Sequence, residues 1–305
     1  MKILIEPPTW LGDAVMATPA IEALLERYPD AEVTMVGSYV STEALKYHPR
    51  VIRSEVLDKG WLALRRKAKA LGHFDLAISF RSSGRSAWFL FFLDADKKCQ
   101  FPKHYSGMHQ VEKYQLFLKE CGLVTEDAGE LKLYVEPYVY SQPTLGINPG
   151  ASYGSAKRWY PESFAEVAVS LAGKYDIVIF GGPGEEEIAK DIESAIHRAG
   201  IENVENLAGK TTIPELLSRI GGLAWMVTND SGPMHVAAAY QVPTVALFGP
   251  TKHKETQQWH NPYSHILRKE MACAPCMKRS CPLKHHDCMK LITADEVIAV
   301  IENEG

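Results

Sequence analysis

The sequence has neither a long apolar run nor a large excess of charge of one sign. Its most apolar stretch, Trp88–Leu93 (WFLFFL), is far shorter than the roughly 20 residues of a membrane-spanning helix. The net charge is −4 and the pI about 6.3, which argues against general nucleic-acid binding. The N-terminal KILIEPP is too short for the apolar segment of a signal peptide. We therefore expect a soluble cytoplasmic protein that binds no nucleic acid.

Cysteine is scarce as well, with six residues in the chain, but four of them lie close together as C-x2-C-x4-C-x6-C. This density is typical of a structural zinc site, although the spacing lacks the usual pair of C-x-x-C knuckles. Disulfides are disfavoured in a reducing cytosol. We favour reduced thiols that pack a loop and expect no bound metal, with zinc as the alternative. The four cysteines are Cys273, Cys276, Cys281 and Cys288.

The Asp94-Ala95-Asp96 triplet superficially resembles a metal-binding DxD pattern. It lies next to Lys97 and Lys98 and far from the other candidate site residues, so we expect no metal role for it.

Strand-like and helix-like segments alternate along the 305 residues, and 46% hydrophobic content is enough for two cores. Such alternation is typical of α/β proteins with parallel sheets and crossover helices. The strands are expected at Lys2–Glu6, Glu32–Val36, Val51–Leu57, Leu76–Phe80, Leu145–Asn148, Asp176–Phe180, Asn203–Asn206, Leu223–Thr228 and Val245–Phe248. The main helices are expected at Ala14–Tyr28, Ser41–Tyr47, Leu62–Leu71, Ser86–Leu93, Gln110–Cys121, Glu162–Lys174, Glu186–Ala199, Thr212–Gly221 and Ala294–Asn303.

Two features refine this prediction. Pro19 lies inside the first helical pattern, so a kink or a late start is expected there. The polar, proline-bearing connection after Glu136 indicates a domain boundary at about Ser141. The sequence thus predicts two domains, residues 1–141 and 142–305.

The stretch Thr228–Thr251 (TNDSGPMHVAAAYQVPTVALFGPT) combines a polar turn, an alanine-rich helix and an apolar strand. The turn offers a hydroxyl at Ser231 and a permissive glycine at Gly232, directly before a helix. Backbone N–H groups at a helix N-terminus bind anions well. The stretch therefore predicts a phosphate-binding site. For Asp230 an N-cap role is the alternative, and for His235 a place in the core.

Further polar loops follow neighbouring predicted strands, where ligands bind in α/β sheets. The loop after Leu145–Asn148 carries Lys157 and Arg158, and the one after Asp176–Phe180 carries Glu185. Cations suit phosphates, and a carboxylate can accept from ribose hydroxyls. The loop after the first strand carries Asp13, a candidate general base or a helix N-cap. The loops of the second domain together predict a nucleotide pocket.

Three segments resemble the lipopolysaccharide heptosyltransferases of glycosyltransferase family 9. They are MKILIEPPTWLGDAVMATPA, NPGASYGSAKRWYPESF and VTNDSGPMHVAAAYQVPTVALFGPT, and they lie along the whole chain. The resemblance implies the GT-B architecture, two Rossmann-like domains with parallel sheets facing across a cleft. It implies transfer of L-glycero-D-manno-heptose from ADP-heptose to a heptose of the lipopolysaccharide inner core, with inversion. A related transferase with a Kdo acceptor, or another nucleotide-sugar donor, is the alternative.

The resemblance also implies roles for residues. Asp13 matches the catalytic base, and Lys157 matches a lysine that contacts the donor diphosphate and aids its departure. Domain 1–141 would bind the acceptor and domain 142–305 the donor. The expected donor-binding residues are Ser152, Tyr153, Lys157, Glu185, Asp230, Ser231, Gly232 and His235. Ser231 stands where many members of the family have threonine, which keeps the hydroxyl.

Basic residues of the first domain are candidates for binding the anionic saccharide acceptor: Arg65, Arg66, Lys69, Arg81 and Arg85. A solvated helix face is the alternative for the first three. We expect a monomer that needs no cofactor, with magnesium optional, and that meets its lipopolysaccharide acceptor peripherally at the inner membrane.

Overall fold

The computed structural model describes residues 1–304. They form two compact units, the first ending at Val135 and the second beginning at Glu136. The division lies slightly before the expected boundary at Ser141, because the connecting segment already bonds to helix α9 (Ile213–Gly221). Ser218 of α9 donates its hydroxyl to the Glu136 carbonyl at 2.8 Å, and its own carbonyl accepts from the Tyr138 N–H at 2.8 Å.

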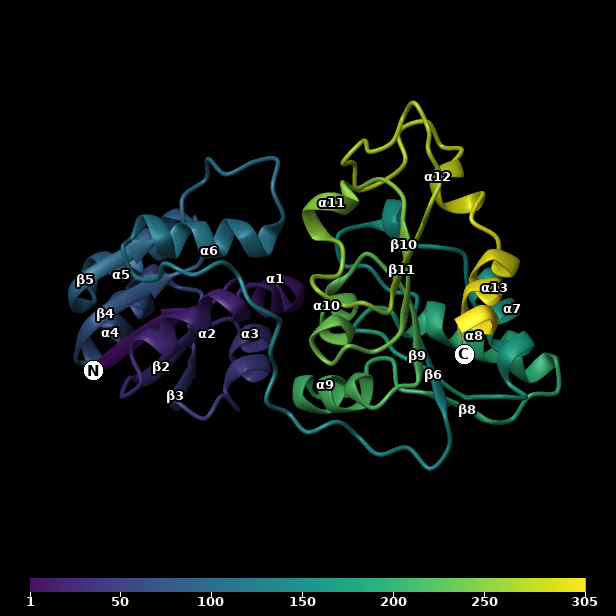
Figure 1. Ribbon diagram of the computed structural model, residues 1–305, viewed down its shortest axis with the longest axis horizontal. Coiled ribbons are helices and arrows are strands. Elements are labelled where there is room, and N and C mark those ends of the chain that lie inside the picture. The colour runs from purple at the N-terminus through teal and green to yellow at the C-terminus, as the bar shows by residue number, and fades with distance from the viewer. Residues whose placement is uncertain (305) are drawn as a thin grey trace. The chain divides into compact units, whose positions relative to one another are not determined.

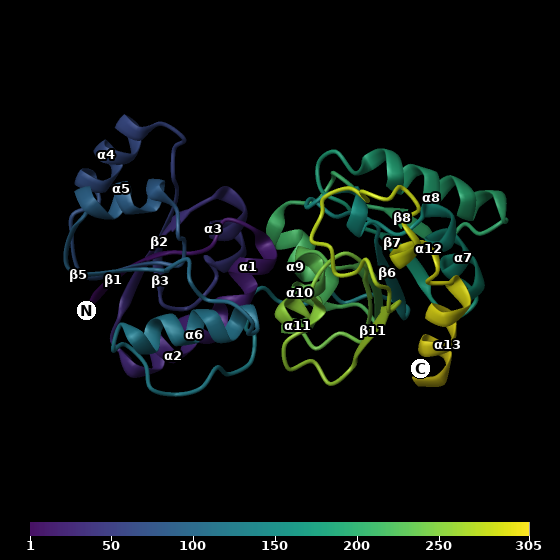
Figure 2. The same ribbon diagram turned by 90° about the horizontal axis from the view of Figure 1, so that it is seen from above.

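The N-terminal unit is a five-stranded sheet in the order β3-β2-β1-β4-β5, with every neighbouring pair parallel. Its strands are β1 (Lys2–Glu6), β2 (Glu32–Gly37), β3 (Val51–Val56), β4 (His73–Ser79) and β5 (Asp94–Gln100). Its helices are α1 (Leu11–Met16), α2 (Thr18–Arg27), α3 (Tyr39–Leu45), α4 (Trp61–Ala70), α5 (Gly84–Phe92) and α6 (Gln110–Glu120). Helices α4 and α5 cover one face, whereas α2 and α6 lie on the other (Figure 2).

The expected helix Ala14–Tyr28 is in fact two helices, α1 and α2, with Ala17 between them. Pro19 lies in the first turn of α2, the part of a helix where a missing N–H does no harm. Strand β5 was not predicted, because its sequence DADKKCQ lacks the alternation of apolar and polar residues that indicates a strand. Its Asp94 lies opposite His73 of β4, so the DxD-like triplet belongs to an edge strand.

A partly buried carboxylate ties the N-terminal unit together at Glu22 of α2. Its Oε2 accepts from the Tyr134 hydroxyl at 2.9 Å, and its Oε1 lies 3.2 Å from His48 Nε2. Burial raises the pKa of Glu22, but the hydrogen bonds from His48 and Tyr134, with the charge of Lys132, outweigh it. The net pKa of Glu22 is therefore below its ordinary value.

The C-terminal unit is a six-stranded parallel sheet in the order β11-β10-β9-β6-β7-β8. Its strands are β6 (Thr144–Asn148), β7 (Asp176–Ile179), β8 (Val204–Asn206), β9 (Trp225–Asn229), β10 (Thr244–Phe248) and β11 (Ser264–Arg268). Besides α9, its helices are the 3₁₀ turn η1 (Ser155–Lys157), α7 (Pro161–Leu171), α8 (Glu186–Arg198), α10 (Gly232–Ala239), α11 (His253–Thr256), α12 (Asp287–Lys290) and α13 (Ala294–Glu304). Figure 1 shows the order of these elements. The short, half-buried β11 was not predicted.

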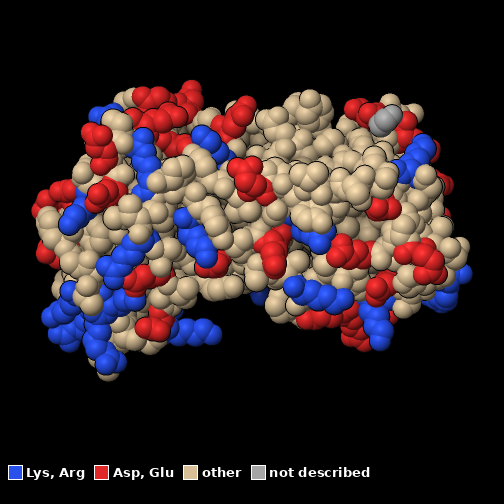
Figure 3. Space-filling view, turned by 90° about the horizontal axis from the view of Figure 1, so that it is seen from below, with Lys and Arg blue, Asp and Glu red and all other residues tan. Residues whose placement is uncertain are grey.

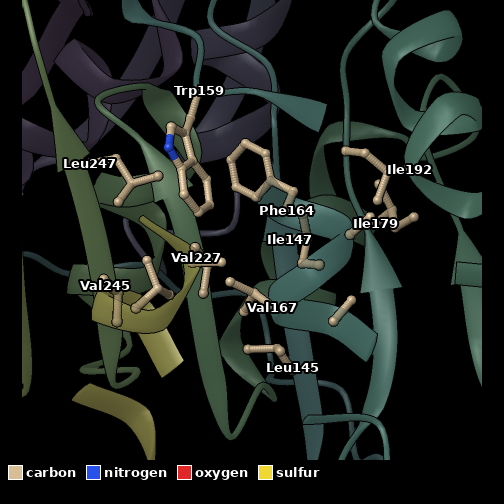
Figure 4. Packing of buried hydrophobic residues seen from close by; sticks show 14 of the residues in the cluster. Leu145, Ile147, Trp159, Phe164, Val167, Ile179, Ile192, Val227, Val245 and Leu247 are labelled. Carbon is tan, nitrogen blue, oxygen red and sulfur yellow. The ribbon is translucent and has the colours of Figure 1, made fainter. Parts of the chain in front are cut away.

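The larger core of this unit lies between its sheet and helices α7, α8 and α13. Val245 and Leu247 of β10 face this core, whereas Ala246 and Phe248 pack with Met234 of α10 on the other face. Figure 4 shows the interlocking side chains of the larger core. Full burial of each large apolar side chain is worth about 1.5–3 kcal/mol, so this packing holds the strand ends in place. The expected α/β class with parallel sheets is confirmed.

Candidate active site

The carboxyl ends of β10, β9, β6 and β7 are neighbours in the C-terminal sheet, so the loops that follow them converge. Two buried amides join these loops. Asn148, at the end of β6, donates from Nδ2 to Thr228 Oγ1 at 3.1 Å and to Ser231 Oγ at 2.9 Å. Asn229, at the end of β9, donates to the Pro149 carbonyl at 2.8 Å. The sequence analysis predicts no role for either side chain, although Asn148 ends a predicted strand and Asn229 directly follows one.

Lys157 and Asp230 form a largely buried ion pair. Lys157 Nζ lies 2.6 Å from Asp230 Oδ2 and also donates to the Asp230 carbonyl at 3.2 Å. Asp230 Oδ2 accepts a second hydrogen bond, from Thr251 Oγ1 at 2.6 Å. The side chains are 13% and 4% exposed, respectively, so the carboxylate depends on these two partners. Lys157 is therefore not a solvated surface lysine. The N-cap alternative for Asp230 is wrong, because Ser231 is the N-cap residue of α10.

Tyr153 lies between two cations. Its ring centroid is 4.9 Å from Lys157 Nζ and 5.5 Å from Arg279 Cζ. Its hydroxyl donates to the Met277 carbonyl at 2.8 Å. The neighbouring Ser152 is exposed. The ring thus links Lys157 to the cysteine-rich segment, here defined as residues 271–288.

The cysteine-rich segment packs against the loop that carries Lys157. The Ala156 N–H donates to the Arg279 carbonyl at 3.0 Å, and the Ala156 carbonyl lies 2.9 Å from His286 Nε2. Tyr160 completes the contact, with its hydroxyl 3.2 Å from His286 Nδ1. Sequence reasoning had left this segment without a contact to the site. Its backbone and His286 fix both sides of Ala156.

The four clustered cysteines are free thiols in the structure. Burial, with the nearby Cys281, Cys273 and Cys276, raises the pKa of Cys288 to about 11. Among residues 1–304, three exposed side chains have potential metal-ligating atoms within 4.8 Å of one another: His73, Asp75 and Asp96. They lie in the N-terminal unit and include none of the cysteines. The expected absence of a structural metal stays a prediction.

Glu185 lies directly over the backbone of Gly150. Its Oε2 accepts from the Gly182 N–H at 2.8 Å, and its Oε1 lies 3.8 Å from Arg158 Nη2. A Cβ at Gly150 would lie 2.0 Å from Glu185 Oε2, so only glycine fits there without moving the carboxylate. The loops after β6 and β7 therefore meet at this contact.

The start of α10 presents the remaining expected residues. Ser231 has an extended backbone (φ −151°), and Gly232 and Pro233 form the first turn. In the described part of the chain, no side chain caps this turn. His235 is 3% exposed and lies one turn further along the helix. Five of the eight expected residues, namely Tyr153, Lys157, Glu185, Asp230 and Ser231, are thus linked through contacts with Asn148, Gly150 and one another. Ser152, Gly232 and His235 are placed by their positions in the chain.

In the N-terminal unit Asp13 lies in the first turn of α1, which follows β1. The N-cap residue of α1 is Trp10, so the N-cap alternative for Asp13 is wrong. Asp13 is half-buried and close to Tyr114 of α6. Burial, and then the negative charge of Asp13, raises the pKa of Tyr114 well above its ordinary value.

The basic residues of this unit differ in their surroundings. Arg81 follows β4, and its Nη1 lies 3.0 Å from Oε1 of the buried Glu6. Arg85 donates to the Asp58 carbonyl. Three of the four cations of α4, namely Arg65, Arg66 and Lys69, are exposed. The first two side chains are therefore held in place, whereas the last three face solvent.

Two Rossmann-like units are the architecture of the GT-B fold, and the second unit has hydroxyl, glycine and lysine residues at the carboxyl edge of its sheet, where ligands bind in such folds. The fold alone does not assign an activity, but the family does. The chain belongs to glycosyltransferase family 9 (heptosyltransferase), whose family model matches residues 123–286. The protein is therefore a glycosyltransferase.

Similar proteins agree with this assignment. The chain is 41% identical to the lipooligosaccharide heptosyltransferase 2 of Campylobacter jejuni serotype O:2, over 99% of this chain and 98% of that protein. It is 29% identical to the lipopolysaccharide heptosyltransferase 2 of Escherichia coli K12, over 88% and 87%. Among solved structures, the ADP-heptose lps heptosyltransferase II of E. coli has a TM-score of 0.81 at 24% identity, covering 100% of both chains. A family 9 transferase of Veillonella parvula has a TM-score of 0.82 at 21% identity, over 99% and 96%. Of the described residues, none form a helix that is long and apolar enough to cross a membrane.

Proposed function

We propose that the protein transfers L-glycero-D-manno-heptose from ADP-heptose to a heptose of the lipopolysaccharide or lipooligosaccharide inner core, with inversion at the anomeric carbon. The observation that carries the proposal is the likeness to lipooligosaccharide heptosyltransferase 2, which spans 99% of the chain at 41% identity. The convergence of Lys157, Asp230 and Ser231 at one sheet edge supports it.

The proposal assigns the donor to the C-terminal unit. An ammonium has three N–H donors, and Lys157 directs two at Asp230, so a third is left for a phosphate oxygen. The N–H groups at Ser231 and Gly232 would share the charge that builds on the departing ADP. Ser152, Tyr153 and His235 would complete the diphosphate and heptose contacts, and Glu185 would accept from the ribose.

The proposal assigns the acceptor to the N-terminal unit. Asp13 would remove the proton from the acceptor hydroxyl as that oxygen bonds to the anomeric carbon and ADP departs. Arg81 and Arg85, together with the cations of α4, suit an anionic saccharide. No metal is assigned to a step, and magnesium is compatible with a diphosphate donor. We further propose a monomer that meets its lipid-linked acceptor peripherally at the inner membrane.

A transfer assay with ADP-heptose tests the proposal directly. Defined inner-core acceptors that carry no heptose or a single heptose are compared, and extension of the single-heptose acceptor is expected. Extension of the heptose-free acceptor alone would favour the Kdo-directed alternative. Competition by ADP, UDP and GDP tests the donor, because only ADP should inhibit strongly.

The base assignment has its own test. Asp13→Ala should lower kcat by about 10²–10⁴-fold, the usual worth of a general base, and leave ADP affinity unchanged. Asp30→Ala, at an exposed carboxylate of the same unit, is the matched control and should retain full turnover. Near wild-type turnover of the Asp13 variant would remove Asp13 from the catalytic role.

A further inference from the structure

Helices α4 and α5 of the N-terminal unit expose large apolar side chains together. Leu62 is 70% exposed, Phe91 73%, Trp61 55% and Trp88 37%. Single exposed apolar residues are common, but a contiguous group of this size marks an interaction surface. We call these four residues the aromatic patch.

Ring contacts join the three aromatic residues of the patch through the half-buried Phe92, and Leu62 is the chain neighbour of Trp61. The ring centroids of Trp61 and Trp88 lie 5.7 Å apart, and those of Trp88 and Phe92 lie 4.8 Å apart. Phe91 follows at 4.9 Å from Phe92. The Trp88 Nε1 donates to the Trp61 carbonyl at 3.3 Å, which fixes α5 against the start of α4. The opposite sides of both helices are buried through Leu64, Ala68, Phe89 and Leu90, so the patch cannot turn inward.

Cations border this patch on the same helices. The α4 sequence WLALRRKAKA carries four basic residues, α5 carries Arg85, and neither helix has an acidic residue. Arg65 Cζ lies 5.0 Å from the Phe92 ring centroid, which places its charge at the edge of the patch. Glu55 of β3 pairs with Lys67 of α4 and with Arg53, so Arg65, Arg66 and Lys69 supply the exposed charge of α4. Figure 3 shows Lys and Arg gathered at its lower left, the end of the unit that carries these helices.

We propose that the aromatic patch and the cations of α4 form a docking surface for a bilayer that contains anionic phospholipids. Tryptophan, phenylalanine and leucine beside lysine and arginine form the residue set that lies in the headgroup and acyl boundary of such membranes. Basic residues near an anionic leaflet strengthen this binding by electrostatic attraction. A second copy of the chain is a poor occupant, because self-contact would bring cations of like charge together.

This inference rests on the proposed function and deepens it, because a lipid-linked acceptor is presented at a membrane surface. The proposed acceptor residues Arg81 and Arg85 lie at or just before the start of α5, on the same unit. Docking through the patch would hold the acceptor edge of the N-terminal sheet at the lipid headgroups.

Vesicle co-sedimentation of the full-length protein tests the surface. Phosphatidylcholine vesicles are compared with vesicles in which about one third of the lipid is phosphatidylglycerol, and stronger binding to the latter, weakened by salt, is expected. Leu62→Ser with Phe91→Ser should lower the partition coefficient at least about tenfold, because two large apolar side chains no longer enter the interface. The matched control, Tyr263→Ser with Leu291→Ser, replaces residues that are 51% and 52% exposed on the other unit and should bind as wild type does.

Two outcomes would overturn the docking surface: absence of wild-type binding to anionic vesicles, or equal losses in the patch and control variants. Sedimentation velocity without lipid tests whether a second copy of the chain binds to the patch instead. A dimer that dissociates in the patch variant, with no vesicle binding, would make the patch a protein interface.

Activity separates this proposal from the proposed function. The patch variant should keep wild-type kcat/KM on a deacylated, water-soluble acceptor and lose activity on an acceptor embedded in anionic vesicles. Equal activity on both acceptors would contradict the role of the surface in catalysis at the membrane. If wild type transferred heptose to neither acceptor, the proposed function would fail while the vesicle-binding result remained valid.

Discussion

Replacing Lys157 with methionine removes the cation that faces Asp230 and changes the side-chain volume little. The Asp230 side chain is 4% exposed, and its carboxylate contacts Lys157 and Thr251. In the variant only the hydrogen bond from Thr251 would remain. Removing one partner of a buried ion pair costs about 3–5 kcal/mol. Because Lys157 itself is 13% exposed and water can reach its place, we expect a loss of ~2–4 kcal/mol in the free energy of unfolding.

A double-mutant cycle separates this electrostatic cost from lost packing. Asp230→Asn removes the charge and keeps the shape, so Lys157→Met with Asp230→Asn should recover much of the stability lost in the single variant. We expect a coupling of at least ~1.5 kcal/mol, well above the additivity error of about 0.5 kcal/mol.

Calorimetry of thermal unfolding can measure the cycle in the whole protein. The transition of the C-terminal unit is identified in wild type as the one that ADP shifts upward, since a ligand stabilises the unit that binds it. A loss below ~0.5 kcal/mol in Lys157→Met, or strictly additive variants, would show that the pair does not hold Asp230. Titration with ADP on the same samples tests the phosphate role, and unchanged affinity in Lys157→Met would refute it.

Three further predictions concern other contacts. Gly150→Ala should displace the Glu185 carboxylate, whose Oε2 would lie 2.0 Å from the new Cβ, and weaken ADP binding roughly tenfold by calorimetry; unchanged affinity would separate Glu185 from the ribose. Gly154 has φ +154°, and an added Cβ would lie 2.3 Å from the Arg279 carbonyl oxygen. Gly154→Ala should therefore lower the free energy of unfolding of the C-terminal unit by ~2–4 kcal/mol. An unchanged unfolding transition would contradict the packing of the cysteine-rich segment. Glu22 has a lowered pKa in the fold, so the stability it contributes is present above its ordinary value of 4.5 and is lost as pH falls through the folded value. Urea midpoints should therefore fall less steeply on acidification in Glu22→Gln, and parallel curves would refute the linkage.

Much of the fold follows from local patterns in the sequence. Buried parallel strands are continuous apolar runs, and KILIE, DIVIF and VALF were recognisable on that ground. The strands that escaped prediction, β5 and β11, lie at sheet edges, where one side of the strand faces solvent or loops and apolar character is not required. Their neighbours in the sheet, and not their own residues, make them strands.

The candidate site divides in the same way. The chemistry of the loop Asn229–Gly232 and of Lys157 was evident from residue types at strand ends, because those properties are local. The ion pair between Lys157 and Asp230 could not be predicted, because the two residues are 73 positions apart in the chain. The N-cap alternatives for Asp13 and Asp230 failed because helix starts shift by one to three residues with tertiary packing.

The sequence by itself determined that this is a two-domain α/β glycosyltransferase of family 9, because strand periodicity, loop chemistry and motif identity are written in contiguous residues. Only the tertiary structure decided which groups meet. It placed Glu185 on Gly150, His286 on Ala156 and the aromatic patch beside the cations of α4. Each of these contacts joins segments that only sheet order and helix packing bring together, and contact energies depend on distances that no linear pattern contains.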